Sequence, residues 1–238
     1  MASTIRGQLK IEIRNLQKIT KDIENLKTGS ERVVKDTLND IRSRAPSWVA
    51  SAVVKTYNFD KKEIVPGSKR AGAEVKQAGS FKVRGERIDD MVLVYSGRLL
   101  TPTHFKMKPS KPLGLQKTAT RIPGKAIKKK RAGASTNVAM IRQPLPYTIT
   151  QEVYKGSRKE LENKHGTPPF LAKNKSGQYI PFQRKGKARD EVDSIKTTSV
   201  PSMVTNEVVK EDYMGTINTE LEKRFKHHAK RHLGITPK

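Results

Sequence analysis

The chain has 238 residues, and its 49 Lys and Arg against 23 Asp and Glu give a formal net charge of +26. Only 34% of the residues are hydrophobic and 5% aromatic, so few apolar side chains are available to form a core in a chain of this length. So large a charge repels itself unless an anionic partner, such as nucleic acid or an acidic protein surface, lies close. Cysteine is absent, which excludes disulfides, thiolate metal sites and cysteine nucleophiles.

No apolar run approaches the roughly 20 residues that a membrane span needs, and the N-terminus lacks the apolar core of a signal peptide. We therefore expect no membrane association, and a soluble protein that is made in the cytoplasm.

Helices are predicted at both ends of the chain. Residues 8–27 carry apolar side chains three or four positions apart, which is typical of an amphipathic helix: Leu9, Ile13, Leu16, Ile19, Ile23 and Leu26. A second helix should follow Gly29 and break or kink at Pro46, because the proline ring clashes with the preceding turn. Ser47 would then cap a short helix in which Trp48 is a packing anchor. The C-terminal helix should bury Val204, Val208, Tyr213, Ile217, Leu221 and Phe225 on one face.

Strands are predicted in the middle of the chain. Met91–Tyr95 is the strongest candidate because it is short and rich in β-branched residues. Residues 99–107, including Phe105 as a packing anchor, should form an irregular strand, and residues 147–154 alternate as a strand does.

Residues 170–189 predict a β-hairpin, because turn-forming residues separate two apolar runs. We expect Phe170, Ile180 and Phe182 to hold this hairpin to the sheet. Its basic residues should face outward as contacts to a neighbour or to DNA: Arg184, Lys185, Lys187 and Arg189.

Residues 108–146 are rich in proline and in basic residues and predict a long loop or arm. Its candidate contact residues are Lys125, Lys128, Lys129, Lys130 and Arg131. Aromatic residues are not interleaved with these cations, which argues against a sequence-reading RNA module. Three interpretations stay open: contact with the DNA backbone, contact with an acidic protein ring, and a solvated loop.

Together these segments predict an α+β fold. An N-terminal helical hairpin (residues 1–55) precedes an α+β domain (residues 56–238), and the two should form one structural unit in an assembly. The α+β domain should hold a small, mostly antiparallel sheet, the long basic arm, and a C-terminal helix packed on the sheet.

Catalytic chemistry has weak support in the sequence. His228 and His232 lie four apart on one helical face, a spacing that could bind a metal, but no acidic residue is close in sequence. With His227 beside them, we favour a solvated basic face. Asp89 and Asp90 precede the strongest strand, where a Mg²⁺-dependent nuclease could place carboxylates. Phosphate-loop and hydrolase motifs are absent, so we expect no enzyme, no cofactor and no metal.

The order of several segments resembles the minor tail protein Z family of long-tailed bacteriophages. The resemblance covers roughly residues 13–233 and is strongest from Phe170 to Met203. It rests on these segments in order: Ala45–Val49, Tyr57–Phe59, Met91–Tyr95, Thr103–Lys106, Phe170–Ala172, Ile180–Lys187 and Ser199–Met203. Two features depart from the family pattern: the acidic continuation at residues 188–193 and the long arm.

The resemblance implies a structural virion protein that completes the head-proximal end of the tail and enables head–tail joining. Its expected partners are copies of itself in a ring, six-fold as the first expectation, the flanking tail-tube or terminator and head-connector proteins, and the DNA in the channel. It would act in the tail or neck after assembly in the host cytoplasm. The alternative is a basic DNA-binding protein that acts through non-specific phosphate contacts.

Overall fold

The computed structural model describes residues 4–14, 16–25, 29–64, 78–121, 127–128, 135–136, 138–144, 147–162, 166–186 and 191–234. The chain forms two compact units. The first, called the helical unit, comprises Met1–Lys106, Glu152–Arg158 and Lys196–Lys238. The second, called the hairpin unit, comprises Met107–Gln151 and Lys159–Ile195.

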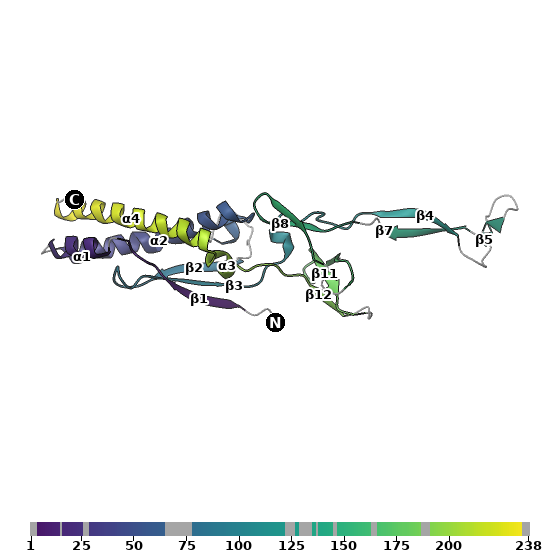
Figure 1. The fold of residues 1–238 in the computed structure, drawn as a ribbon, viewed down its shortest axis with the longest axis horizontal. Helices are drawn as coiled ribbons and strands as arrows, with labels where there is room; N and C mark the ends of the chain where they lie inside the picture. The colour runs from purple at the N-terminus through teal and green to yellow at the C-terminus, as the bar shows by residue number, and fades with distance from the viewer. Residues whose placement is uncertain are drawn as a thin grey trace. The chain divides into compact units, whose positions relative to one another are not determined.

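The helical unit joins the two ends of the chain. Two long helices, α2 (Ser30–Thr56) and α4 (Glu207–Leu233), lie side by side along a three-stranded sheet (Figure 1). The unit therefore unites the predicted N-terminal helices with the C-terminal helix, and it divides the chain differently from the boundary expected after residue 55. The reason is that α4 makes its most extensive contact with α2.

The remaining elements of this unit are short. A ten-residue helix, α1 (Leu16–Asn25), precedes α2, and α3 (Val200–Val204) precedes α4. Two 3-10 turns, η1 (Lys61–Glu63) and η2 (Pro102–His104), occupy the connections. No described helix is long and apolar enough to cross a membrane.

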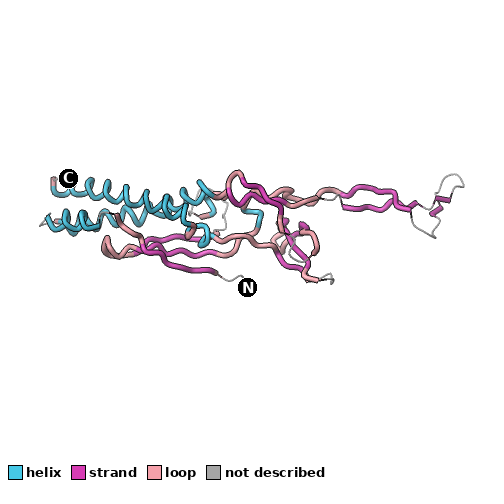
Figure 2. The backbone as a smooth tube through the Cα atoms, viewed as in Figure 1, coloured by secondary structure: helices cyan, strands magenta, loops and turns pink. Residues whose placement is uncertain are grey.

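The sheet of the helical unit is antiparallel, with strand order β1–β3–β2. Its strands are β1 (Ile5–Lys10), β2 (Gly79–Arg84) and β3 (Val92–Gly97). The central strand β3 confirms the prediction for Met91–Tyr95 to within two residues. Figure 2 shows the three strands as magenta tubes running along the helices.

The prediction of a helix over residues 8–27 is wrong in its first half. Leu9 pairs with Leu93 in the β1–β3 ladder, and the Ile11 amide donates to the Met91 carbonyl at 2.9 Å. Leu9, Ile11 and Ile13 also alternate with a period of two, so the pattern suits a strand as well as a helix. Pairing with the strong central strand decides between them.

Of the two outcomes expected at Pro46, the break does not occur, since α2 continues through this residue. Proline removes one backbone hydrogen bond and costs about 3 kcal/mol inside a helix. Ile41, Ala45, Val49 and Val53 flank it and are fully buried. Burial of a branched aliphatic side chain contributes about 1.5–3 kcal/mol, so packing on both sides offsets the break.

The hairpin unit contains the predicted arm and the predicted hairpin. Within the arm, β4 (Leu115–Arg121) pairs antiparallel with β7 (Val138–Pro144), from Leu115 opposite Pro144 to Arg121 opposite Val138. A short pair, β5 (Ile127–Lys128) and β6 (Ser135–Thr136), lies between them in the chain. The arm is therefore a β-ribbon over its described residues, where a loop was expected.

The predicted hairpin is confirmed. Its strands β10 (Phe170–Lys173) and β11 (Tyr179–Arg184) pair antiparallel, and β12 (Val192–Ser194) extends the sheet. The turn has Gly177 at φ 79°, and the Asn174 carboxamide accepts hydrogen bonds from the amides of Ser176 and Gln178 at 3.0 Å. One further hairpin, β8 (Thr150–Tyr154) with β9 (Ser157–Glu160), has residues Glu152–Arg158 in the helical unit and its two outer ends in the hairpin unit.

Candidate interaction surfaces and a histidine cluster

The sheet of the helical unit has one buried and one exposed face. Leu93 lies opposite Leu9 on one side and Val83 on the other, and these side chains point toward the helices. Because side chains alternate along a strand, the neighbouring positions point away from the core. We call this second side the outer sheet face.

The outer sheet face is basic. Its edge strands present four exposed cations: Arg6, Lys10, Lys82 and Arg84. Val92 and Val94 of the central strand lie between them and are half-buried. None of the three strands contains an acidic residue, and no described acidic residue pairs with these cations. Sequence reasoning missed this surface because β1 was predicted as helix.

The β10–β11 hairpin places its aromatic residues differently from the prediction. Leu171 is buried in the core of the hairpin unit, where it joins Met107, Ile149 and Leu161, and Ile180 on the other side of the strands is also buried. Phe170 and Phe182 lie opposite each other on the other side of the strands, half-buried, with ring centroids 6.2 Å apart. Of the three residues expected to hold the hairpin to the sheet, Ile180 is buried, while Phe170 and Phe182 stack on each other at the half-buried side.

The two hairpin cations that the structure describes, Arg184 and Lys185, already contact other residues of this chain. The Arg184 guanidinium lies over the Phe170 ring at 5.6 Å from its centroid. Lys185 contacts the Asp193 carboxylate at 2.8 Å, and this hydrogen bond raises the pKa of the Lys185 ammonium. Lys187 and Arg189 lie outside the described residues, as do Lys125, Lys129, Lys130 and Arg131, and only the backbone of Lys128 is described.

The two predicted anchors of the helical unit pack on its core. Phe105 is fully buried, with its ring centroid 5.6 Å from that of Phe59, and Trp48 is partly buried against the same core.

The acidic residues proposed for a nuclease have a structural role in the turn before β3. The Asp90 carboxylate accepts the amide of Arg87 at 2.9 Å, and Asp89 pairs with the Arg87 side chain at 3.1 Å.

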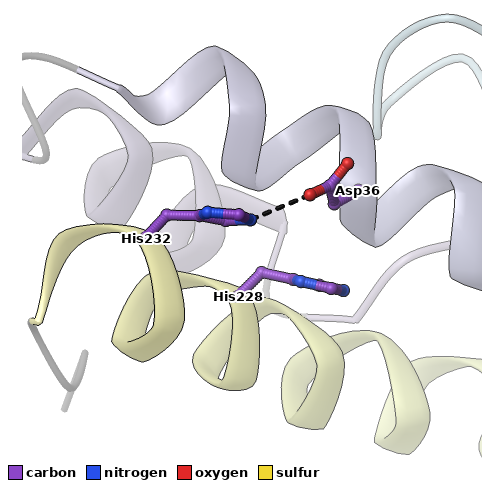
Figure 3. A group of neighbouring side chains, drawn as sticks. All are labelled: Asp36, His228 and His232. Carbon is purple, nitrogen blue, oxygen red and sulfur yellow. Dashed lines mark hydrogen bonds and ion pairs between the residues drawn. The ribbon is translucent and has the colours of Figure 1, made fainter.

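The histidines of α4 contact acidic residues of α2. His232 Nε2 lies 2.8 Å from Asp36 Oδ2, and His228 Nε2 lies 3.2 Å from Asp40 Oδ2 (Figure 3 shows the first contact). The expectation of a solvated basic face is wrong for His228, which is 6% exposed. His227 is exposed, as expected. The adjacent His232 lowers the pKa of the Asp36 carboxyl by hydrogen bonding to it.

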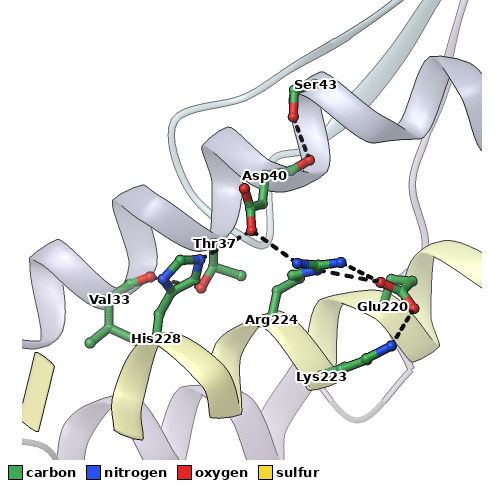
Figure 4. Close-up of polar contacts among 8 residues, drawn as sticks. All are labelled: Val33, Thr37, Asp40, Ser43, Glu220, Lys223, Arg224 and His228. Carbon is green, nitrogen blue, oxygen red and sulfur yellow. Dashed lines mark hydrogen bonds and ion pairs between the residues drawn. The ribbon is translucent and has the colours of Figure 1, made fainter. Parts of the chain in front are cut away.

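A second polar chain extends from Asp40. Arg224 lies 3.6 Å from Asp40 and 3.3 Å from Glu220, which also accepts from Lys223 at 3.3 Å (Figure 4). The acidic partners were missed because they lie almost 200 positions away in sequence. One signal was available: Asp36 and Asp40 are four apart, as are His228 and His232. In antiparallel helices, equal spacings of this kind place two pairs in register.

Comparisons with family models, curated proteins and solved structures found no match to this chain. The resemblance to the tail protein family therefore stays a prediction that rests on the order of the sequence segments.

Proposed function

We propose that this chain is a structural subunit of a bacteriophage tail or neck. In this role it joins a homo-oligomeric ring that completes the head-proximal end of the tail and enables head–tail joining. The order of the segments between Ala45 and Met203 supports the proposal, and so does a charge of +26, which suits a ring around a DNA channel.

The observation that carries the proposal is the ribbon formed by β4 and β7. These two strands contact each other and no other described helix or strand to a comparable extent. An isolated two-stranded ribbon is at best marginally stable in water. Each of its strands also presents one row of unpaired backbone groups, which can pair with a strand of another chain. A subunit that assembles with its neighbours through such strand pairing gives the ribbon the partner that it lacks in the single chain.

Removal of the ribbon tests this role. Leu115 and Pro144 are paired across the ribbon, so a short Gly-Ser linker can join residues 114 and 145 without displacing the flanking chain. We expect the shortened chain to keep the far-ultraviolet circular dichroism of the helical unit and to lose ring formation in multi-angle light scattering. A ring of unchanged stoichiometry would contradict the role of the ribbon. Phage particles that lack the whole chain should show separated heads and tails in negative-stain images, and normal infectious virions would refute the proposed function itself.

The outer sheet face favours a second candidate function, which is non-specific DNA binding. Four cations without an acidic neighbour on one sheet face provide phosphate contacts. Replacing both Lys82 and Arg84 by Glu should weaken duplex binding at least tenfold and reduce the slope of log K against log salt by about 2. The matched control replaces the exposed Lys226 and Lys230 of α4 by Glu, which makes the same change in net charge elsewhere. Equal losses in both double variants would mean that only total charge matters, and no binding by the unaltered chain would exclude this function.

A further inference from the structure

Two imidazoles and a carboxylate meet between α2 and α4. One ligand atom from each of Asp36, His228 and His232 can be chosen so that all three atoms lie within 4.8 Å of one another. The two histidine rings are nearly parallel, with centroids 6.0 Å apart and an interplanar angle of 12°. Figure 3 shows both rings on one side of α4, facing the carboxylate of α2. Nitrogen and oxygen donors of these types are ligands of Zn²⁺ and related ions.

The surroundings of His228 match those of a metal ligand. This side chain is more than nine-tenths buried, and its Nδ1 has no hydrogen-bond partner among the described residues. Its other ring nitrogen, Nε2, lies 3.2 Å from the Asp40 carboxylate. A ligating histidine usually binds the metal through one nitrogen and a carboxylate through the other. Asp40 provides that carboxylate, and a metal ion would use the nitrogen that is left.

We propose that Asp36, His228 and His232 bind one divalent transition-metal ion of the Zn²⁺ class, which links the C-terminal part of α4 to α2. Metal–ligand bonds of about 2.0–2.2 Å at tetrahedral angles place neighbouring ligand atoms about 3.4 Å apart. The 2.8 Å contact between His232 and Asp36 therefore opens by about 0.6 Å, and the widest pair closes by a larger amount. Side-chain rotation is enough for both movements.

The site is open to ions and selective for them. The Asp36 side chain is 35% exposed, which gives an ion access from solvent and leaves a fourth coordination position for water. Arg224 of α4 is paired with Asp40 and Glu220, so its charge is compensated. Two imidazoles favour Zn²⁺, Ni²⁺ and Cu²⁺ over Mg²⁺ and Ca²⁺, which prefer oxygen ligands.

The experiment uses the full, untagged chain, because a histidine tag would bind the same ions. The protein is treated with a chelator, dialysed and titrated with Zn²⁺ by calorimetry, with Mg²⁺ in parallel. Bound metal is counted by mass spectrometry. The test variants are Asp36→Asn and His232→Gln, which alter partly exposed ligands, and the control is His227→Gln, which removes an exposed neighbouring histidine. Circular dichroism checks that each variant keeps the helices.

We expect one Zn²⁺ per chain, no response to Mg²⁺, and an affinity at least tenfold weaker in Asp36→Asn and His232→Gln. His227→Gln should bind as the unaltered chain does. At a hundredfold excess of free ion over Kd, the melting temperature of the unaltered chain should rise by about 5–10 °C. Absence of Zn²⁺ binding, equal binding by the Asp36 variant, or loss of binding in the His227 variant would each overturn the proposal. None of these outcomes bears on the proposed assembly role.

Discussion

Val208 and Val209 of α4 offer a matched test of how this helix packs. The two residues are adjacent and identical, but Val208 is 65% exposed and Val209 is fully buried. Val209 begins a row of buried residues that recurs every four positions and faces the core. We predict that Val209→Ala destabilises the helical unit, whereas Val208→Ala leaves it almost unchanged.

The magnitude follows from what each substitution removes. Deleting two buried methyl groups costs about 1.6 kcal/mol in lost transfer free energy, and the cavity adds up to about 1 kcal/mol. Alanine has the higher helix propensity and returns about 0.5 kcal/mol at both positions. The expected loss is therefore about 1–2 kcal/mol for Val209→Ala. For Val208→Ala, the small burial loss and the propensity gain cancel to about zero.

Urea denaturation followed by tryptophan fluorescence measures the free energy of unfolding of the helical unit, in which both valines lie. The chain has one Trp, and this residue, Trp48, packs on the core of the helical unit. Its emission therefore reports the unfolding of that unit even if the hairpin unit unfolds separately. The midpoint should fall for Val209→Ala with an unchanged m-value. Equal shifts for the two variants, or a larger shift for Val208→Ala, would refute this packing of α4. Such a result would favour the face predicted from the sequence, on which Val208 is buried.

Three further predictions concern other parts of the chain. Gly177→Ala should destabilise the hairpin unit by about 1–2 kcal/mol in a denaturant titration, because Gly177 has φ 79° although its surroundings leave space for a methyl group. Gly215→Ala should instead raise the melting temperature, because Gly215 lies inside α4 with open space around it and alanine favours a helix by about 1 kcal/mol. The Gly156 amide and then Arg158 lower the pKa of the Glu152 carboxyl, so the stability that this group contributes is present above the pKa of an unfolded glutamate and is lost as pH falls through the folded value. A pH series of melting temperatures should show this loss in the unaltered chain and a smaller one in Glu152→Gln, and identical curves would contradict it.

Local chemistry explains which elements could be predicted from the sequence. The β10–β11 turn depends on Asn174 and Gly177, which determine the backbone within a few residues. The central strand β3 is likewise encoded in a compact β-branched run. The α+β class follows from such segments and is confirmed by the described elements.

Long-range packing explains what could not be predicted. The spacing of Leu9 and Ile13 suits a helix, and only the ladder with β3 makes Leu9 part of a strand. Pro46 stays inside α2 because residues of distant segments bury its neighbours. The burial of His228 and its carboxylate partner depends on a helix at the other end of the chain, and the matching four-residue spacings are the one hint of this pairing that the sequence holds.

The paired contacts between α2 and α4 also have a consequence for the alignment of the two helices. The buried row of α4 repeats every four residues through Val209, Tyr213, Ile217, Leu221, Phe225 and Ala229. A slide by one turn, about 5.4 Å, would still set an apolar residue of α4 at each buried place, although residues of different size would exchange places. The polar contacts are less permissive, because a slide in either direction leaves His228 or His232 without its carboxylate. The apolar row thus holds the helices together, and the histidine–aspartate pairs add a polar requirement that favours the observed alignment over one shifted by a turn.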